Sequence, residues 1–205
     1  ILEKNKGKIS LNTMADIMRD VGEDSENYEP DKAELKQNLV CMHAKPHPDA
    51  FWHATGAMIT DSNEDGIIVW MTGSAANDLS IFKPLFFNIP LPNQLNFLPR
   101  GVYDNKSYWW KHEKLHRRAI INYKELKPEI RNSFDEIERK FFTESPNLRK
   151  ASDKEKIEFS QHCWDEAENL TDKLIEKISK RNFPIKSGPF IDMWNNFNRE
   201  ANFSL

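Results

Sequence analysis

Glycine and proline, the residues that most constrain where a chain can turn, are distributed unevenly along this sequence. Four of the seven glycines and four prolines lie between residues 56 and 101, and no glycine follows Gly101 until Gly188. Glycine and proline punctuate strands and tight turns, whereas a long segment without glycine favours helices. The sequence therefore predicts a block of strands followed by a block of helices. That is the pattern of an α+β fold, and it differs from alternating βαβ units.

Four short apolar runs in the first half have the character of β-strands. The predicted strands are 38–44, 51–60, 67–72 and 80–87. A polar turn over 61–66 joins the second and third runs, as in a hairpin. We therefore expect the first three strands to be antiparallel neighbours in one sheet. Pro84 cannot donate a ladder hydrogen bond, so it confines the fourth strand to an edge or breaks it.

Apolar residues recur at helical spacing near the start of the chain and throughout its second half. The predicted helices are 11–20, 108–123, 129–142, 152–180 and 190–199. Ser10 or Asn12 can cap the first helix. Ser152 and Glu155 have the spacing of a capping box for the longest one. We divide the chain into a helix-plus-strand block, 1–107, and a helical region, 108–205, that packs on it.

Composition narrows the classes of function. The 29 basic and 32 acidic residues give a net charge of −3, whereas a nucleic-acid-binding domain typically has a basic excess. No apolar run approaches the roughly 18 residues that a membrane span needs. Two cysteines are too few for a disulfide scaffold, which favours an intracellular, cytoplasmic setting.

Cys41 and His43 are the first candidates for chemistry. On a strand, residues two apart share a face, and an imidazolium beside a thiol lowers the thiol pKa. One interpretation is therefore a Cys–His nucleophile pair, and the other is a buried cysteine with a polar neighbour. These two residues with His47 and His53 also suggest a zinc site, although their spacing matches no standard ligand pattern.

His112, Glu113 and His116 form the pattern H-E-x-x-H, which is typical of zinc peptidases. In such enzymes both imidazoles bind zinc, and a third ligand follows downstream. Glu136 or Glu138 is available for that role. The flanking residues instead favour a surface helix in which 111–118 is a solvated face. The aromatic residues 108–110 are expected to be core.

Several segments together resemble one protein family. The sequences CMHAKPHPDAFWHATGAMI, IIVWMTGSAANDLSIFKPLFF and YWWKHEKLHR follow one another in this order, and ADIMRDVG precedes them. They resemble the second half of the secernin and cysteine-dipeptidase group of N-terminal nucleophile hydrolases. The resemblance covers about residues 11–118. It is more specific than the H-E-x-x-H pattern, which becomes a coincidence within a family motif.

The resemblance implies the C-terminal half of a four-layer αββα sandwich. In this family a cysteine at the mature N-terminus attacks an amide, but this chain begins at Ile1. We therefore expect no catalytic residue, metal or cofactor in this chain. The expected function is that of the non-nucleophile half, a fragment or a subunit, of a cysteine amidohydrolase of the dipeptidase type. The candidates for its substrate pocket are Cys41, His43, Thr55 and Lys83.

The same resemblance implies the partners. The N-terminal half of the enzyme would cover the sheet, the substrate would be a dipeptide or small amide, and the chain would be part of an oligomer. Two other functions remain open. One is a secernin-like protein-interaction module without catalysis, and the other is the zinc peptidase.

Overall fold

The computed structural model of the chain describes residues 2–22, 27–32, 39–48 and 52–205. The fold is α+β, as the sequence predicts, with a small antiparallel sheet and several helices. The described residues form one sheet, in the order β1–β2–β3. Its strands are β1 (Met58–Asn63), β2 (Gly66–Met71) and β3 (Lys83–Phe86).

The β1–β2 hairpin confirms the predicted pairing of the second and third strand candidates. Its register runs from Met58 opposite Met71 to Asn63 opposite Gly66. Only two residues separate the strands, so β1 continues into what the sequence predicts to be turn. Gly66 has a φ of +138° there, a conformation that side chains rarely allow. Pro84 lies in β3, which is an edge strand, in agreement with its missing N–H group.

The predicted first strand is wrong over the residues that can be checked. Residues 39–44 contain no strand, residues 52–57 lie outside β1, and residues 38 and 51 fall outside the described part of the chain. The backbone of this segment makes single hydrogen bonds instead of a ladder. The N–H of Cys41 donates to the carbonyl of Asp20, and the carbonyl of Met42 accepts from Ala54. A strand needs a partner along its length, and no described segment pairs with residues 39–44 in that way.

The helices follow the predicted order. The α-helices are α1 (Leu11–Met18), α2 (Tyr108–Ile121), α3 (Tyr123–Glu144), α4 (Asp153–Ser179) and α5 (Pro189–Glu200). Short 3-10 helices are η1 (Glu3–Asn5), η2 (Asn77–Leu79), η3 (Asn93–Leu95) and η4 (Ser145–Leu148). The Ser10 cap and the Ser152–Glu155 capping box are both present. Helix α3 begins six residues before its predicted start and contains Pro128. No helix in the described ranges combines the length and the apolar composition that crossing a bilayer requires.

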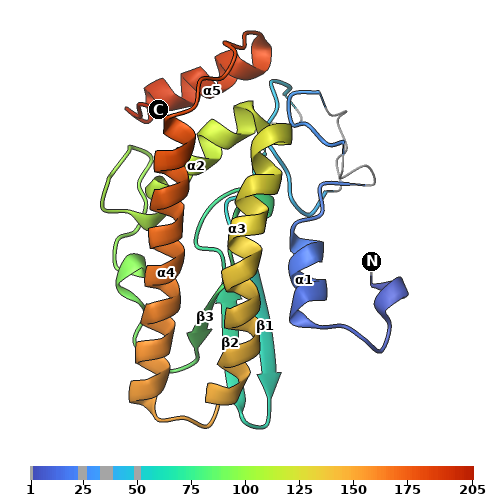
Figure 1. Ribbon diagram of the computed structural model, residues 1–205, viewed down its shortest axis with the longest axis vertical. Coiled ribbons are helices and arrows are strands. Elements are labelled where there is room, and N and C mark those ends of the chain that lie inside the picture. The colour runs from blue at the N-terminus through green and yellow to red at the C-terminus, as the bar shows by residue number, and fades with distance from the viewer. Residues whose placement is uncertain (1, 23–26, 33–38, 49–51) are drawn as a thin grey trace.

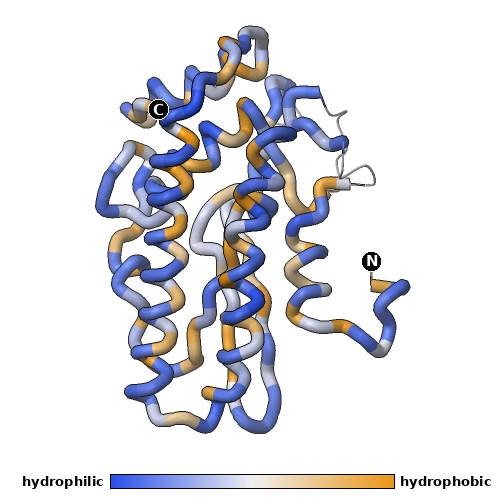
Figure 2. The backbone as a smooth tube through the Cα atoms, viewed as in Figure 1, coloured by the Kyte–Doolittle hydropathy of each residue, from blue (hydrophilic) through white to orange (hydrophobic). Residues whose placement is uncertain are grey.

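Helices α3 and α4 run antiparallel and lie over one face of the sheet (Figure 1). Trp70 of β2 packs edge-on against Phe142 of α3, with ring centroids 4.7 Å apart. Phe86 of β3 packs against Phe159 of α4. The apolar positions of the two helices alternate with polar ones along their length, as the hydropathy colouring shows (Figure 2). The main core therefore lies between this face and the helices.

The opposite face of the sheet is apolar but incompletely covered. Met58 is 57% exposed, Ile67 37% and Phe87 68%. We call these three residues, with the half-buried Val69, Met71 and Leu85, the open sheet face. The register places Val69 opposite Leu85 and Met71 opposite Met58, so these side chains adjoin one another. The exposed Thr60 and Ser62 of β1 alternate onto the same face, opposite Val69 and Ile67, and make its β1 edge polar.

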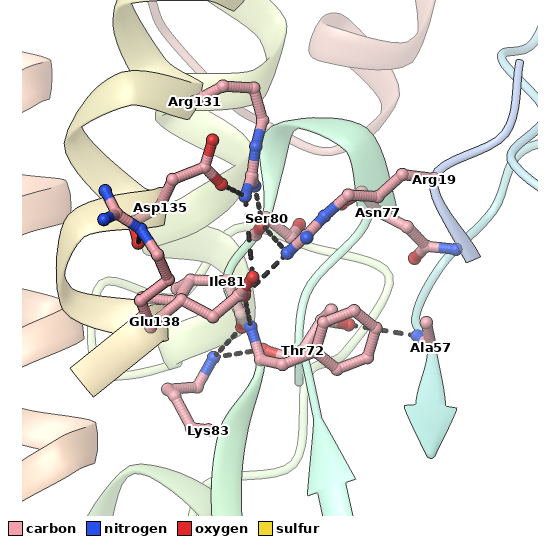
Figure 3. Close-up of polar contacts among 12 residues, drawn as sticks. Arg19, Ala57, Thr72, Asn77, Ser80, Ile81, Lys83, Arg131, Asp135 and Glu138 are labelled. Atoms are coloured by element: carbon pink, nitrogen blue, oxygen red, sulfur yellow. Dashed lines mark hydrogen bonds and ion pairs between the residues drawn. The ribbon is translucent and has the colours of Figure 1, made fainter. Parts of the chain in front are cut away.

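A buried charge network fixes the connection between β2 and β3 (Figure 3). The Glu138 carboxylate of α3 accepts from Arg19 at 2.6 Å and from the backbone N–H of Phe82 at 2.7 Å. Arg19 and Arg131 both donate to the carbonyl of Ser80. The network ties α1 and α3 to the segment that follows η2, and η2 carries a residue of the site described next.

Candidate functional site

A buried carboxylate, Asp78, is the centre of one polar cluster. It lies in η2 and is 1% exposed. Ala76, the residue before η2, has a φ of +54°, a left-handed conformation at the entry to this helix. The Cys41 thiol donates to Asp78 at 3.2 Å, and His43 Nε2 lies 3.0 Å from Oδ1. The phenol of Tyr123 also donates to this carboxylate.

The surroundings keep Asp78 ionised. Burial alone would raise its pKa, but His43, the Lys127 ammonium 3.8 Å away and the Tyr123 hydrogen bond together hold the pKa well below its usual range. Burial and the neighbouring Asp78 carboxylate raise the pKa of the Cys41 thiol. The thiol is therefore neutral, fully buried and donating to a carboxylate, which is the opposite of an activated nucleophile.

A second buried carboxylate, Glu113, lies on α2. Its Oε1 is 3.0 Å from His116 Nδ1, and its Oε2 accepts from Arg117 Nε at 2.7 Å. Arg117 also donates to Asn198 of α5 at 2.7 Å. Burial opposes ionisation, but His116 and Arg117 lower the pKa of Glu113 to about 2. The prediction that 111–118 is a solvated face is therefore wrong, because one side of α2 is buried under α5 and against His53.

Three imidazoles converge between the two carboxylates. The ring centroids of His53 and His116 are 4.7 Å apart, and those of His43 and His53 are 5.5 Å apart. One nitrogen from each ring lies within 4.8 Å of the others. His43 Nδ1, His53 Nε2 and His116 Nε2 are buried and have no hydrogen-bond partner in the described part of the chain. We call these three residues the histidine triad.

The four predicted pocket residues separate into three places. Cys41 and His43 lie together at Asp78, whereas Thr55 is exposed at the rim of a surface cavity. Lys83 is fully buried elsewhere, 4.4 Å from the Trp164 ring and 4.8 Å from the Tyr108 ring. Burial lowers the pKa of Lys83 to about 7, and its ammonium donates to two backbone carbonyls.

The fold does not bring together all the residues of either sequence pattern that suggested zinc. His43 and His53 meet, but His47 belongs to neither group of ligand side chains that the described residues form. His112 is also in neither group, and its Nε2 lies 3.1 Å from Ser80 Oγ. Its partner in the H-E-x-x-H pattern, His116, is a member of the histidine triad. The pattern thus contributes one residue to a polar cluster that its spacing does not describe.

Sequence reasoning missed Asp78 and Tyr123. Asp78 follows Asn77 within the run 73–82, which is otherwise made of small and apolar residues. An acidic residue within an apolar run indicates a buried carboxylate, and a buried carboxylate requires polar partners. This signal in the sequence could have predicted a polar cluster at Asp78. Tyr123 carries no comparable signal, since its contact with Asp78 spans 45 residues.

A cavity of about 640 Å³ lies beside the open sheet face. Met58 and Met71 form part of its wall, and the segment 94–100 forms another part. Its lining is mostly apolar, and Thr55 and Arg100 add polar groups. Among the described residues, the Arg100 guanidinium has no hydrogen bond or ion pair with a side chain. A volume of this size is typical of small-molecule sites.

Comparisons with protein-family models, with curated proteins and with solved structures find no match to this chain.

Proposed function

We propose that this chain is the non-nucleophile half of a cysteine N-terminal nucleophile amidohydrolase of the dipeptidase type. The observation that carries the proposal is the open sheet face. One face of the sheet is covered by α3 and α4, and the other presents apolar side chains of β2, β3 and Met58 beside the polar Thr60 and Ser62 of β1. In an αββα sandwich that second face is where another sheet packs, about 10 Å away.

The energetics favour a covering partner. Burying one large apolar side chain completely contributes about 1.5–3 kcal/mol. The open sheet face offers three exposed side chains and three that are already half-buried, so a partner would gain the full amount only at the first three. Exposed Phe97 (50%) and Leu98 (85%) extend the apolar surface beyond the sheet. Apolar patches of this kind on a protein typically mark interaction sites. The occupant we propose is the N-terminal half of the same enzyme, which would bring its own sheet and its nucleophile.

The cavity supports the choice of substrate. It adjoins the face where the two sheets would meet, so a partner sheet would complete its wall. The lining is mostly apolar, and the guanidinium of Arg100 pairs with no side chain of the described residues. Such a lining fits a small ligand with an apolar side chain and a carboxylate. A dipeptide has both. Thr55 at the rim can donate or accept one hydrogen bond from its amide.

Both cysteines of the chain are unsuited to act as the nucleophile. Burial raises the pKa of Cys41 and of Cys163, and both side chains are fully buried. The attacking thiolate would therefore come from the partner half, and this chain would supply part of the pocket wall.

The experiment is expression of the whole natural reading frame that contains this chain, followed by mass spectrometry of the mature N-termini and assays of dipeptide hydrolysis. We expect a cysteine at one mature N-terminus. We also expect Cys41→Ala to keep turnover within a few-fold, because the thiol contributes only packing and one hydrogen bond. An Arg100→Gln variant should raise KM more than it lowers kcat. Loss of all turnover in a folded, assembled Cys41→Ala protein would assign the chemistry to the Cys–His pair and refute the proposal.

The open sheet face equally fits the second candidate, a secernin-like interaction module without catalysis. The same preparation distinguishes the two. An assembled protein whose mature N-termini include no cysteine, and which hydrolyses no dipeptide, would favour the interaction module.

A further inference from the structure

We propose that the histidine triad, His43, His53 and His116, binds a divalent transition-metal ion and that zinc fits it best. This inference goes beyond the function proposed above and does not depend on it. Three imidazole nitrogens with one open position are a ligand set that zinc accepts. The triad would hold the ion between α2 and the two residues His43 and His53, neither of which lies in a helix or strand.

The first argument is the cost of leaving the three nitrogens unpaired. His43 is 3% exposed and His116 0%, and the free nitrogen of each ring is buried. A buried polar atom without a partner is destabilising. The three rings that carry these nitrogens each bring one nitrogen within 4.8 Å of the others, so one occupant could serve all three. The indole ring of Trp194 packs edge-on against both His53 and His116, which closes one side of the space.

The second argument is which nitrogen carries the ring proton in two of the three imidazoles. His43 Nε2 lies against Asp78, and His116 Nδ1 lies against Glu113. A carboxylate oxygen accepts hydrogen bonds, so the ring nitrogen that faces each carboxylate is the one assigned the proton. The opposite nitrogens, His43 Nδ1 and His116 Nε2, therefore present lone pairs to the centre. A carboxylate behind each metal-binding imidazole is the usual arrangement of zinc sites.

The third ring needs one rearrangement. The backbone N–H of Ala44 donates to His53 Nδ1 at 3.3 Å, so the proton of the neutral ring lies on Nε2. Metal binding at Nε2 requires that this proton move to Nδ1, and the Ala44 hydrogen bond is then lost. No proton is released overall. We therefore expect weaker binding than in a fully prearranged three-histidine site.

A single water molecule is the competing occupant. It would donate to His43 and His116 and accept from the Nε2–H of His53, and it would need no rearrangement. The second group of ligand side chains, Cys41 with His43 and Asp78, is a poorer choice for an ion. Its members already hydrogen-bond to one another, so an ion there would have to break those bonds.

The test uses the protein without a polyhistidine tag, stripped of metal and then dialysed against zinc. We expect one zinc per chain by elemental analysis, and a higher melting temperature with zinc than without it. The variant His53→Gln should lose the bound zinc and the zinc-dependent rise in melting temperature. The matched control is His162→Gln on α4, whose side chain is 60% exposed and outside the triad. It should keep both.

Substitution with cobalt(II) provides a second readout that needs no variant. Three nitrogen ligands and a water give strong visible absorption bands typical of tetrahedral cobalt, without a thiolate charge-transfer band. The proposal is overturned if less than a tenth of the chains retain zinc, which would leave water as the occupant. It is also overturned if His53→Gln retains zinc in full, or if the thiolate band places the ion at Cys41.

Discussion

Replacing Glu138 with glutamine tests whether the buried charge network holds the connection between β2 and β3. Glu138 is 4% exposed. Its carboxylate accepts from Arg19 at 2.6 Å and from the N–H of Phe82 at 2.7 Å, and it lies 3.7 Å from Arg131. Glutamine has nearly the same shape. One oxygen, Oε2, accepts both bonds, so a glutamine oxygen in its place can keep them. The substitution instead removes the negative charge that compensates the two guanidinium groups, and it places an NH₂ group near Arg131.

The expected loss in the free energy of unfolding follows from the two guanidinium groups whose charge is no longer compensated. Breaking a buried ion pair from one side costs about 3–5 kcal/mol, since the remaining charge is uncompensated. The side chains of Arg19 and Arg131 are 13% and 12% exposed, so some solvation remains. We therefore expect the lower end of that range, about 3 kcal/mol. For a chain of this size that loss lowers the melting temperature by about 6–12 °C.

Urea unfolding, followed by circular dichroism, measures the free energy of unfolding of each variant. The matched control is Asp135→Asn, which removes a carboxylate from the same Arg131 but at a position that is 45% exposed. We expect the control to lose less than about 1 kcal/mol, because exposed pairs contribute little. Equal losses in the two variants, or a loss below about 1 kcal/mol in Glu138→Gln, would refute the reasoning.

Two further predictions concern packing and pH. Gly73 has a φ of +59°, and a Cβ there would lie 2.8 Å from the Trp164 ring. The variant Gly73→Ala should therefore lower the free energy of unfolding, measured in urea, by about 2–4 kcal/mol. The control is Gly101→Ala, where nothing lies within 4 Å of the new Cβ. Its free energy of unfolding should stay within about 0.5 kcal/mol of that of the unchanged protein. Similar losses at both positions would contradict the packing argument. Burial, with a smaller contribution from the nearby His116, lowers the pKa of His112 to about 3, whereas an unfolded histidine titrates near about 6.5. Between these values the unfolded chain binds more protons, so the free energy of unfolding should fall by about 2 kcal/mol from pH 6.5 to pH 5. His112→Gln should reduce this slope, and exposed His162→Gln should leave it unchanged; a slope unaffected by His112→Gln would contradict a buried neutral imidazole.

The sequence was sufficient where structure depends on neighbours along the chain. The Ser10 cap, the Ser152–Glu155 capping box and the apolar positions of α3 and α4 all rest on contacts within one or two helical turns. The 67–72 strand and its hairpin were also predictable, because a short polar turn joins the two strands.

Features that depend on distant partners were not predictable in the same way. The apolar run 39–44 has strand character, but it becomes a strand only if another strand lies beside it. The buried side of α2 was misjudged, since polar residues such as Glu113 and Arg117 satisfy each other instead of facing water. The histidine triad combines His43 and His53 with a residue of α2 more than 60 positions away in the sequence.

The position of Asp78 has a consequence for the order of folding. Its bonds to Cys41 and Tyr123 close loops of 37 and 45 residues in opposite directions along the chain. Helices α3 and α4 are joined by only eight residues, so their mutual packing requires far less loss of chain entropy. Local contacts of this kind tend to form early, and distant ones late. We therefore expect the helical hairpin to assemble first and the Asp78 cluster last. Backbone amides near Cys41 should accordingly exchange with solvent through partial openings, while those at the centres of α3 and α4 should exchange only on complete unfolding.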